Sequence, residues 1–391
     1  MKITLKNNIV GIFNSDFGAS YGFGIDDYYK VKDLAKKGYI NKLIFRDKDV
    51  SNFSFDYKLV VKAIPLGNLI PRCYSALQIY SKGKIRTTYY YQKTFDFFAK
   101  AKIPKLENGI LFTVPSLPSC VSKAKELNYK VVLSVGAHPK WISNIYKSEY
   151  VKYGVPLPSD FEQRIFDRQL DSLKKADFLI STSEFHKQTL VENSFPNEKI
   201  FVNSLGVDLE TFKQTENLDN KLRFLFLSHI SLTKGLQYLL KAWENLKIKN
   251  AELIICGQCF PEFQNILKYY VNRLDSIKYV GPIQNPNKFY ENSSVFILPS
   301  LIEGMSRAVL EAMSSGIPPI TTKIAAPYLK NDYDGIVIPP RDIKAIENAI
   351  LFFYDNRKEI TRMGNNARKT VEKLSWASHS SRMVEIFEQI F

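Results

Sequence analysis

Apolar residues between positions 295 and 322 follow two different periods in succession. A short apolar run, Val295–Leu298, predicts a buried strand, and a second strand is expected after Pro318. Between the two, apolar residues recur at helical spacing and predict a helix over about 305–315, which Gly316 ends. The apolar face of this helix comprises Met305, Ala308, Val309, Ala312 and Met313. The stretch therefore predicts a βαβ unit of a parallel sheet.

Two carboxylates lie outside this apolar face. On a helical wheel, Glu303 and Glu311 lie about 80° apart and more than roughly 120° from the centre of the apolar face. In a doubly wound sheet, the loop after a strand opens on the ligand-binding crevice, and the amides of residues 304–307 would also point there. Carboxylates beside a helix start suit a ligand with hydroxyls and phosphates. Alternatively, Glu303 complements the helix dipole and Glu311 pairs with Arg307.

Strands and helices alternate along the rest of the chain, which predicts an α/β fold with doubly wound parallel sheets. We expect strands over residues 2–13, 130–135, 222–227, 251–256 and 276–280, and helices over 25–37 and 375–391. A length of 391 residues suffices for two domains, each with its own core. We place an N-terminal domain at 1–212, a second domain at 213–374 that begins with a polar linker, and a final helix at 375–391.

The composition is that of a globular protein without disulfide bonds. Apolar residues make up 45% and charged residues 24% of the chain. No stretch approaches the roughly 18 apolar residues of a membrane-spanning helix, and the first residues contain no apolar run of signal type. Four cysteines at this length form no disulfide framework. We therefore expect a cytoplasmic protein.

Two short motifs resemble reactive sites but have simpler explanations. Cys256 and Cys259 have the spacing of a redox motif, yet they follow an apolar run, which favours a buried strand end over a redox or zinc site. Asp332 and Asp334 form an Asp-x-Asp pattern known from metal sites, but Gly335 follows them as in an ordinary turn. We expect neither a metal ion nor a cofactor.

Positive charge is concentrated in the N-terminal half. The net charge is +15, and residues 1–205 contain 31 Lys and Arg against 19 Asp and Glu, whereas residues 206–391 contain 23 against 20. Residues 57–95 contain no acid, and basic residues alternate there with tyrosines. Such a surface suits a nucleic acid or an anionic membrane. No nucleic-acid recognition motif accompanies the charge, and a nucleic acid would leave the two glutamates without a role, so we favour the membrane.

Several segments resemble one enzyme family. Residues 299–322 closely resemble the Glu-x7-Glu segment of family 4 glycosyltransferases. Residues 176–208 resemble the last N-terminal unit and the hinge of this family, and residues 228–235 its donor-phosphate loop. The resemblance covers nearly the whole chain and is weakest over residues 40–115. It implies the GT-B fold, with two doubly wound, Rossmann-like domains facing a central cleft and a final helix that returns to the first domain.

The resemblance also implies roles for individual residues, with His138, Lys234 and Glu303 as the catalytic group. Glu311 would accept hydrogen bonds from ribose hydroxyls, and Glu303 from donor-sugar hydroxyls. Lys234 would stabilise charge on the leaving diphosphate, and His138 would contact the donor sugar from the opposite domain. His229 stands where the family usually has arginine, so a fixed cation becomes a titratable group. Further candidates are Gln284, Gly304, Met305, Ser306 and Arg307 at the donor, and Gly22 and Gly24 in an acceptor or phosphate loop.

The implied activity is a retaining, metal-independent transfer of a hexose from a UDP- or GDP-type sugar. The acceptor would be lipid-linked, a glycan or another molecule, and the leaving phosphate would take its proton. The basic N-terminal half adds the expectation of a peripheral position at the cytoplasmic face of the membrane. Two alternatives remain open. A GT-B nucleotide-sugar epimerase would turn over without an acceptor, and a catalytically inactive nucleotide-sugar binding protein would bind the donor without transfer.

Overall fold

Parallel β-sheets organise the chain, which the computed structural model divides into two units. The first unit comprises Met1–Ser143, Leu157–Ser204 and Ala377–Phe391, and the second comprises Asn144–Pro156 and Leu205–Trp376. The structure describes residues 4–17, 23–48, 57–64, 69–80, 87–157, 163–214 and 221–391. The chain therefore enters the second unit before residue 157, returns to the first, and ends in the first unit after crossing the second.

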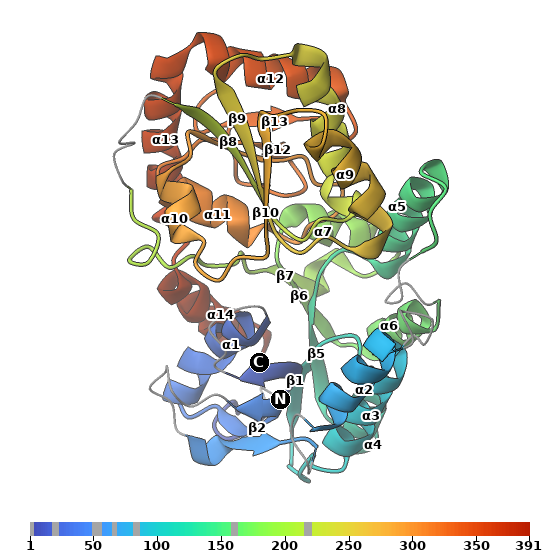
Figure 1. The fold of residues 1–391 in the computed structure, drawn as a ribbon. Helices are drawn as coiled ribbons and strands as arrows, with labels where there is room; N and C mark the ends of the chain where they lie inside the picture. Colours follow the sequence, from blue (N-terminus) through green and yellow to red (C-terminus); the bar gives the residue numbers. More distant parts are fainter. Residues whose placement is uncertain are drawn as a thin grey trace. The chain divides into compact units, whose positions relative to one another are not determined.

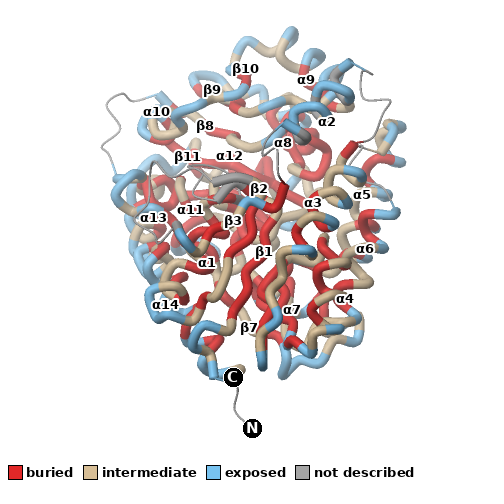
Figure 2. Tube along the Cα trace, turned by 90° about the horizontal axis from the view of Figure 1, so that it is seen from below, coloured by how far each residue is buried: buried red, intermediate tan, exposed pale blue. Residues whose placement is uncertain are grey.

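In the described ranges, the first unit contains a seven-stranded sheet with all neighbouring strands parallel. Its strands are rich in buried apolar residues, as expected of a parallel sheet covered by helices, and Figure 2 shows β1 as a largely buried strand. The strand order is β3 (Val60–Lys62), β2 (Ile40–Lys48), β1 (Ile9–Phe17), β4 (Ile110–Thr113), β5 (Lys130–Val135), β6 (Phe178–Ser181) and β7 (Ile200–Val202).

Helices connect these strands (Figure 1). One of them, α5 (Pro139–Lys152), begins in the first unit and ends in the second. The helices that lie within the first unit are α1 (Phe23–Lys36), α2 (Leu69–Tyr80), α3 (Thr88–Lys100), α4 (Pro118–Glu126), α6 (Gln163–Lys175) and α7 (Glu184–Val191).

The second unit contains a six-stranded parallel sheet in the part of the chain that the structure describes. The strand order is β10 (Ile277–Gly281), β9 (Ala251–Cys256), β8 (Leu222–Leu227), β11 (Val295–Leu298), β12 (Pro319–Thr322) and β13 (Ile336–Ile338). Its helices are α8 (Leu236–Leu246), α9 (Gln264–Val271), α10 (Asn287–Glu291), α11 (Arg307–Ser314), α12 (Ile343–Asp355) and α13 (Arg357–Val371). The predicted α/β class with two parallel sheets is confirmed.

Most strands lie where the apolar runs predict them. Strands β5, β8, β9 and β11 have the predicted bounds, and β10 is shifted by one residue. The first strand was expected over 2–13, which is wrong, because β1 runs from Ile9 to Phe17 and a turn precedes it. In that turn Asn7 has a φ of +57°, which strand geometry excludes, and its N–H donates to Gly38 O at 2.8 Å.

The last helix, α14 (Trp376–Ile390), completes the core of the first unit. Phe387 is fully buried, and its ring centroid lies 5.2 Å from that of Phe112 on β4. Ser380 Oγ donates to Tyr29 O of α1 at 2.7 Å, and Figure 1 shows α14 alongside α1. The predicted return of the final helix to the first domain is confirmed. Within the described ranges, every helix is too short or too polar to cross a membrane.

The structure confirms the simpler explanations of the two reactive-looking motifs. Cys256 is the last residue of β9, and burial raises the pKa of its thiol to about 12 and that of Cys259 to about 11. Asp332 has a φ of +60° in a turn closed by its N–H and Gly335 O. Asp334 is fully buried and accepts hydrogen bonds from Lys330 N–H and the Thr370 hydroxyl, both at 2.8 Å. Its carboxylate therefore closes a turn.

Candidate active site

The sheet of the second unit reverses its strand order between β8 and β11. Strands β9 and β10 extend from β8, and β12 and β13 extend from β11. In open parallel sheets, ligands bind outside the carboxyl ends of the strands at such a switch point. His229 and Lys234 follow β8, and Glu303 follows β11. The topology therefore brings three of the predicted donor residues to the part of the sheet where a ligand is expected.

Lys234 and Glu303, which lie 69 positions apart in the sequence, form an ion pair. Lys234 Nζ lies 2.5 Å from Glu303 Oε1, and 20% and 15% of the two side chains are exposed. The same ammonium donates to Ile302 O at 3.5 Å. Because solvent reaches the pair only in part, its charges are screened less than those of a surface ion pair.

Close packing of two loops holds this pair in place. Leu301 N–H donates to Thr233 O at 2.8 Å, which joins the loop after β11 to the loop after β8. Gly235 has a φ of +74°, and a Cβ atom at this position would lie 2.0 Å from Pro299 O. Glycine thus allows the backbone that follows Lys234 to approach the end of β11.

The start of α11 differs from the sequence expectation. Ser306 is the N-cap in an extended conformation, and its Oγ accepts from Val309 N–H at 3.4 Å, so the helix begins at Arg307 and not at about 305. Glu303 therefore precedes the helix, and the helical-wheel argument for its position is wrong. The Ser306 N–H donates to Ala325 O at 2.9 Å. This amide, predicted to point toward a ligand, fixes the loop.

Glu311 lies on α11 and accepts a hydrogen bond from a residue that the sequence did not single out. Tyr290, on the short helix α10, has its hydroxyl 2.9 Å from Glu311 Oε2 and 3.2 Å from Ala308 O. Tyr290 is 1% exposed. A tyrosine five residues before the apolar run of β11 is an ordinary core residue by its pattern, so no local signal marks this contact.

His229 stacks on Phe260, with ring centroids 5.6 Å apart and an interplanar angle of 27°. Desolvation lowers the pKa of His229, and the positive charge of Lys234 lowers it further, while Glu303 partly offsets both effects. The ring is therefore neutral at neutral pH. At the position where the family usually has arginine, this chain therefore has an uncharged imidazole ring, which can donate or accept a hydrogen bond.

The remaining predicted donor residues occupy different surroundings. Gln284 is exposed in the loop after β10, at the edge of the sheet and two strands from β8. The side chain of Met305 is buried, so only its backbone could meet a ligand. Gly304 and Arg307 are partly buried, one before and one at the first residue of α11. The predicted donor residues that follow β11 thus lie in one continuous segment of the chain, and Gln284 lies outside this segment.

His138 belongs to the first unit, directly after β5 and before α5. Its backbone N–H donates to Thr189 Oγ1 at 2.9 Å, and its Nδ1 accepts from Lys140 N–H at 3.3 Å. Because Nδ1 accepts, the neutral ring carries its proton on Nε2. Burial, and to a smaller degree the charge of Lys140, lower the pKa of His138, so the ring is neutral at neutral pH.

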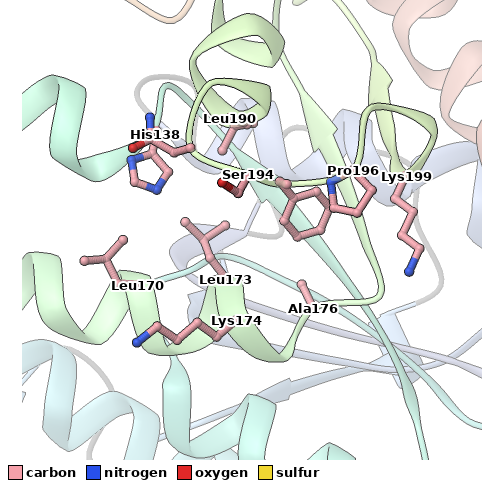
Figure 3. A pocket seen from close by; sticks show the side chains of 11 residues that line it. His138, Leu170, Leu173, Lys174, Ala176, Leu190, Ser194, Pro196 and Lys199 are labelled. Carbon is pink, nitrogen blue, oxygen red and sulfur yellow. The ribbon is translucent and has the colours of Figure 1, made fainter.

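A cavity of about 350 Å³ in the first unit borders His138. Figure 3 shows His138 at one end of this cavity and Lys199 at the other. Lys174 adds a second ammonium group from α6. The apolar walls of the cavity are formed by Leu170, Leu173, Ala176, Leu190, Phe195 and Pro196. The cavity therefore combines apolar walls with cationic residues.

The predicted glycine loop of the first unit is only partly described. Gly22 lies outside the described residues, and Gly24 was expected just before a helix starting at residue 25. Gly24 instead lies within α1, which begins at Phe23, and it is buried. Gly24 lies in the first turn because α1 begins two residues earlier than the sequence predicts.

The described residues contain no cluster of metal-binding side chains. Among the residues that the structure describes, no three His, Cys, Asp or Glu side chains lie close enough together to hold a metal ion. The charged side chains among the predicted donor residues are those of Lys234, Glu303, Arg307 and Glu311.

Comparison with known proteins extends these observations. Residues 208–370 match the family model of glycosyl transferases group 1. The capsular polysaccharide biosynthesis glycosyltransferase CapM of Staphylococcus aureus is 27% identical over 50% of this chain and 56% of its own length. The UDP-Gal:alpha-D-GlcNAc-diphosphoundecaprenol alpha-1,3-galactosyltransferase of Escherichia coli is 31% identical over 44% of this chain and 49% of its own length. The chain thus spans about half the length of these two relatives.

Solved structures match over almost the full chain. The sucrose-phosphate synthase of Thermosynechococcus elongatus has a TM-score of 0.71 and 18% identity, covering 98% of this chain and 99% of its own. HepE of Anabaena, in complex with UDP and glucose, has a TM-score of 0.66 and 12% identity, covering 98% and 100%. These likenesses establish the fold. Residues 208–370 thus resemble the glycosyl transferases group 1 family, and the chain has the GT-B fold.

Proposed function

We propose that this protein transfers a hexose from a nucleoside diphosphate sugar to an acceptor with retention of configuration. The observation that carries the proposal is the pairing of Lys234 with Glu303 at the strand-order switch between β8 and β11. A cation, a carboxylate and a helix start at this place provide complementary groups for a diphosphate and for sugar hydroxyls. Glu311 on the following helix supplies a further acceptor for hydroxyls.

Each residue at the donor has a physical task in this proposal. Lys234 stabilises the negative charge that grows on the diphosphate as the glycosidic bond breaks. Glu303 accepts hydrogen bonds from donor-sugar hydroxyls, and Glu311 accepts them from the ribose. The acceptor hydroxyl attacks from the face that the diphosphate leaves, and the leaving phosphate takes its proton. His138 of the first unit, neutral with its proton on Nε2, has an N–H group that can donate a hydrogen bond to a sugar hydroxyl.

Relatives support a UDP-type donor. The Escherichia coli relative carries UDP-Gal in its name, and the Anabaena structure contains UDP and glucose. Because His229 is neutral where arginine is usual, Lys234 carries the charge that this loop presents to a phosphate. A donor with a uridine or guanosine base fits the proposal, and a screen of nucleoside diphosphates by thermal shift would identify the base.

We also propose a membrane-held acceptor at the cytoplasmic face. The N-terminal half carries an excess of 12 positive charges, and the Escherichia coli relative acts on a diphosphoundecaprenol-linked sugar according to its name. In the first unit, a cavity with apolar walls and the ammonium groups of Lys174 and Lys199 suits an amphiphile with an acidic group. Both features favour a lipid-linked acceptor over a neutral soluble one.

Substitution of the ion pair tests the catalytic proposal. If Lys234 and Glu303 act mainly in the transition state, Lys234→Ala and Glu303→Ala should each lower turnover by about 100-fold or more. Lys241→Ala and Glu244→Ala provide matched controls, because these two residues form an i,i+3 pair at 2.8 Å on α8 and are not among the predicted site residues, so the variants should retain normal turnover. Near-normal transfer by both site variants would contradict the assignment.

The same assay separates the two alternatives. Turnover of a nucleotide sugar in the absence of any acceptor, with a changed sugar as product, would indicate an epimerase. Nucleotide binding without transfer or hydrolysis would indicate an inactive binding protein. The proposed transferase requires both donor and acceptor for release of the nucleoside diphosphate.

A further inference from the structure

Tyr290 is enclosed on all sides in the core of the second unit. It is 1% exposed, and its ring lies 5.8 Å from Phe212 at an angle of 82° and 6.1 Å from Phe296 on β11. Ser314, on α11, donates its hydroxyl to Phe212 O at 2.7 Å. The phenol ring therefore has little freedom to move, and its hydroxyl has a fixed position relative to α11.

The hydroxyl meets two acceptors but has one proton to donate. It lies 2.9 Å from Glu311 Oε2 and 3.2 Å from Ala308 O. A carboxylate is a stronger acceptor than a peptide carbonyl, and its contact is the shorter one, so the proton points at Glu311. Burial and the charge of Glu311 raise the pKa of Tyr290 well above its usual value, which keeps the proton in place at any pH of interest.

We infer that Tyr290 is a positioning residue, which holds the carboxylate of Glu311 in the orientation that receives the ribose hydroxyls of the donor. The inference rests on the proposed function, because it assumes that Glu311 contacts the ribose. A glutamate side chain has three rotatable bonds, and a single hydrogen bond to Oε2 removes much of that freedom before the donor arrives. Tyr290 thus lowers the entropy cost of donor binding without touching the donor.

The test measures discrimination for the ribose hydroxyls. UDP and GDP are each titrated alongside their 2′,3′-dideoxy counterparts, and the ratio of the two dissociation constants is the ribose discrimination. Tyr290→Phe keeps the ring and removes the hydroxyl, so it should reduce this ratio by about 5- to 10-fold, the size of one ordinary hydrogen bond. Affinity for the dideoxy nucleotide should change by less than about 2-fold.

Two comparisons separate positioning from a loss of stability. Tyr129→Phe removes a hydroxyl from another buried tyrosine, which donates to Pro104 O at 2.7 Å, and should lower the melting temperature without changing ribose discrimination. In a double-mutant cycle, Tyr290→Phe should have no effect on the ratio once Glu311→Ala is present, because the tyrosine acts only through that carboxylate.

The outcomes distinguish this inference from the proposed function. Ribose discrimination that Tyr290→Phe leaves unchanged, or lowers equally in the Glu311→Ala background, would overturn the positioning role while the transferase proposal stands. Failure of the unmodified protein to bind either UDP or GDP would overturn the proposed function, and the role of Tyr290 with it.

Discussion

At the scale of the single residue, His229 determines part of the charge of the loop after β8, which we propose to bind the donor phosphate. Its ring is stacked on Phe260, and desolvation together with Lys234 lowers its pKa. A neutral imidazole can donate one hydrogen bond to a phosphate but adds no Coulomb attraction. Protonation would add a positive charge beside the phosphate, so donor affinity attributable to His229 should rise as the pH falls through its pKa, below about pH 6.5.

Replacing this histidine tests the argument. His229→Arg supplies a permanent charge and should strengthen UDP binding at pH 8 by about 5-fold, on the order of 1 kcal/mol. The advantage over the unmodified protein should shrink as the pH falls below the lowered pKa of His229 and the histidine becomes charged as well. Calorimetric titration at several pH values provides the measurement, and taking the ratio at each pH cancels the titration of the nucleotide itself.

A matched control adds the same charge elsewhere. Asn272→Arg lies at the exposed end of α9 and should leave UDP affinity unchanged at low and high pH. An affinity ratio for His229→Arg that stays constant between pH 8 and a pH below the lowered pKa of His229 would show that protonation of His229 does not reach the phosphate.

Among the structural elements, the loops after β8 and β11 can approach each other closely only because one residue between them is a glycine. Gly235 combines a φ of +74° with a backbone approach that leaves no room for a Cβ atom, which would lie 2.0 Å from Pro299 O. A residue with a side chain must therefore separate the two loops that carry Lys234 and Glu303. The consequence is that stability and donor binding are coupled at this position.

Gly235→Ala should destabilise the second unit by more than about 2 kcal/mol, since it adds a steric clash to the cost of a left-handed conformation. It should also weaken nucleotide binding. Gly154→Ala is a suitable control in the same unit, because Gly154 has a φ of +62° and nothing within 4 Å of the position of a Cβ atom, so only the conformational cost of about 1 kcal/mol applies. Thermal unfolding of both variants would reveal the difference, and equal shifts would contradict the clash.

For the molecule as a whole, the uneven charge is the feature with a functional consequence. Near an anionic bilayer, each lysine or arginine contributes on the order of 1 kcal/mol, an attraction that salt screens. The acid-free, tyrosine-rich segment 57–95 concentrates such residues, and Lys82, Lys84 and Arg86 of this segment lie outside the described residues. A few contacts of this strength would give reversible docking.

Sedimentation with liposomes measures the docking. Binding should require anionic lipid, weaken between low and high salt, and decrease when Lys82, Lys84 and Arg86 are changed to Glu. Charge reversal of Lys268, Arg273 and Lys278, which are exposed in the second unit, changes the net charge equally and should have a much smaller effect. Absence of sedimentation with anionic vesicles at low salt would rule out the docking surface.

Local patterns in the sequence determined the elements of this fold. Apolar runs bounded by glycine, proline or polar residues gave the bounds of β5, β8, β9 and β11, because a strand buried on both faces needs little more than such a run. Helical spacing located α11, and resemblance to a family singled out Lys234, Glu303 and Glu311. Because these signals extend over only a few residues, the periodicity of the side chains is sufficient to reveal them.

Only the tertiary structure decided how these elements act on one another. Strand order brings Lys234 to Glu303 across 69 positions, and the N-cap at Ser306 starts α11 two residues later than periodicity predicts. The contact of Tyr290 with Glu311 spans 21 positions and two helices. Apolar patterns specify that a segment is buried but not which segment lies beside it, because many partners bury the same apolar area and the sheet topology selects one of them.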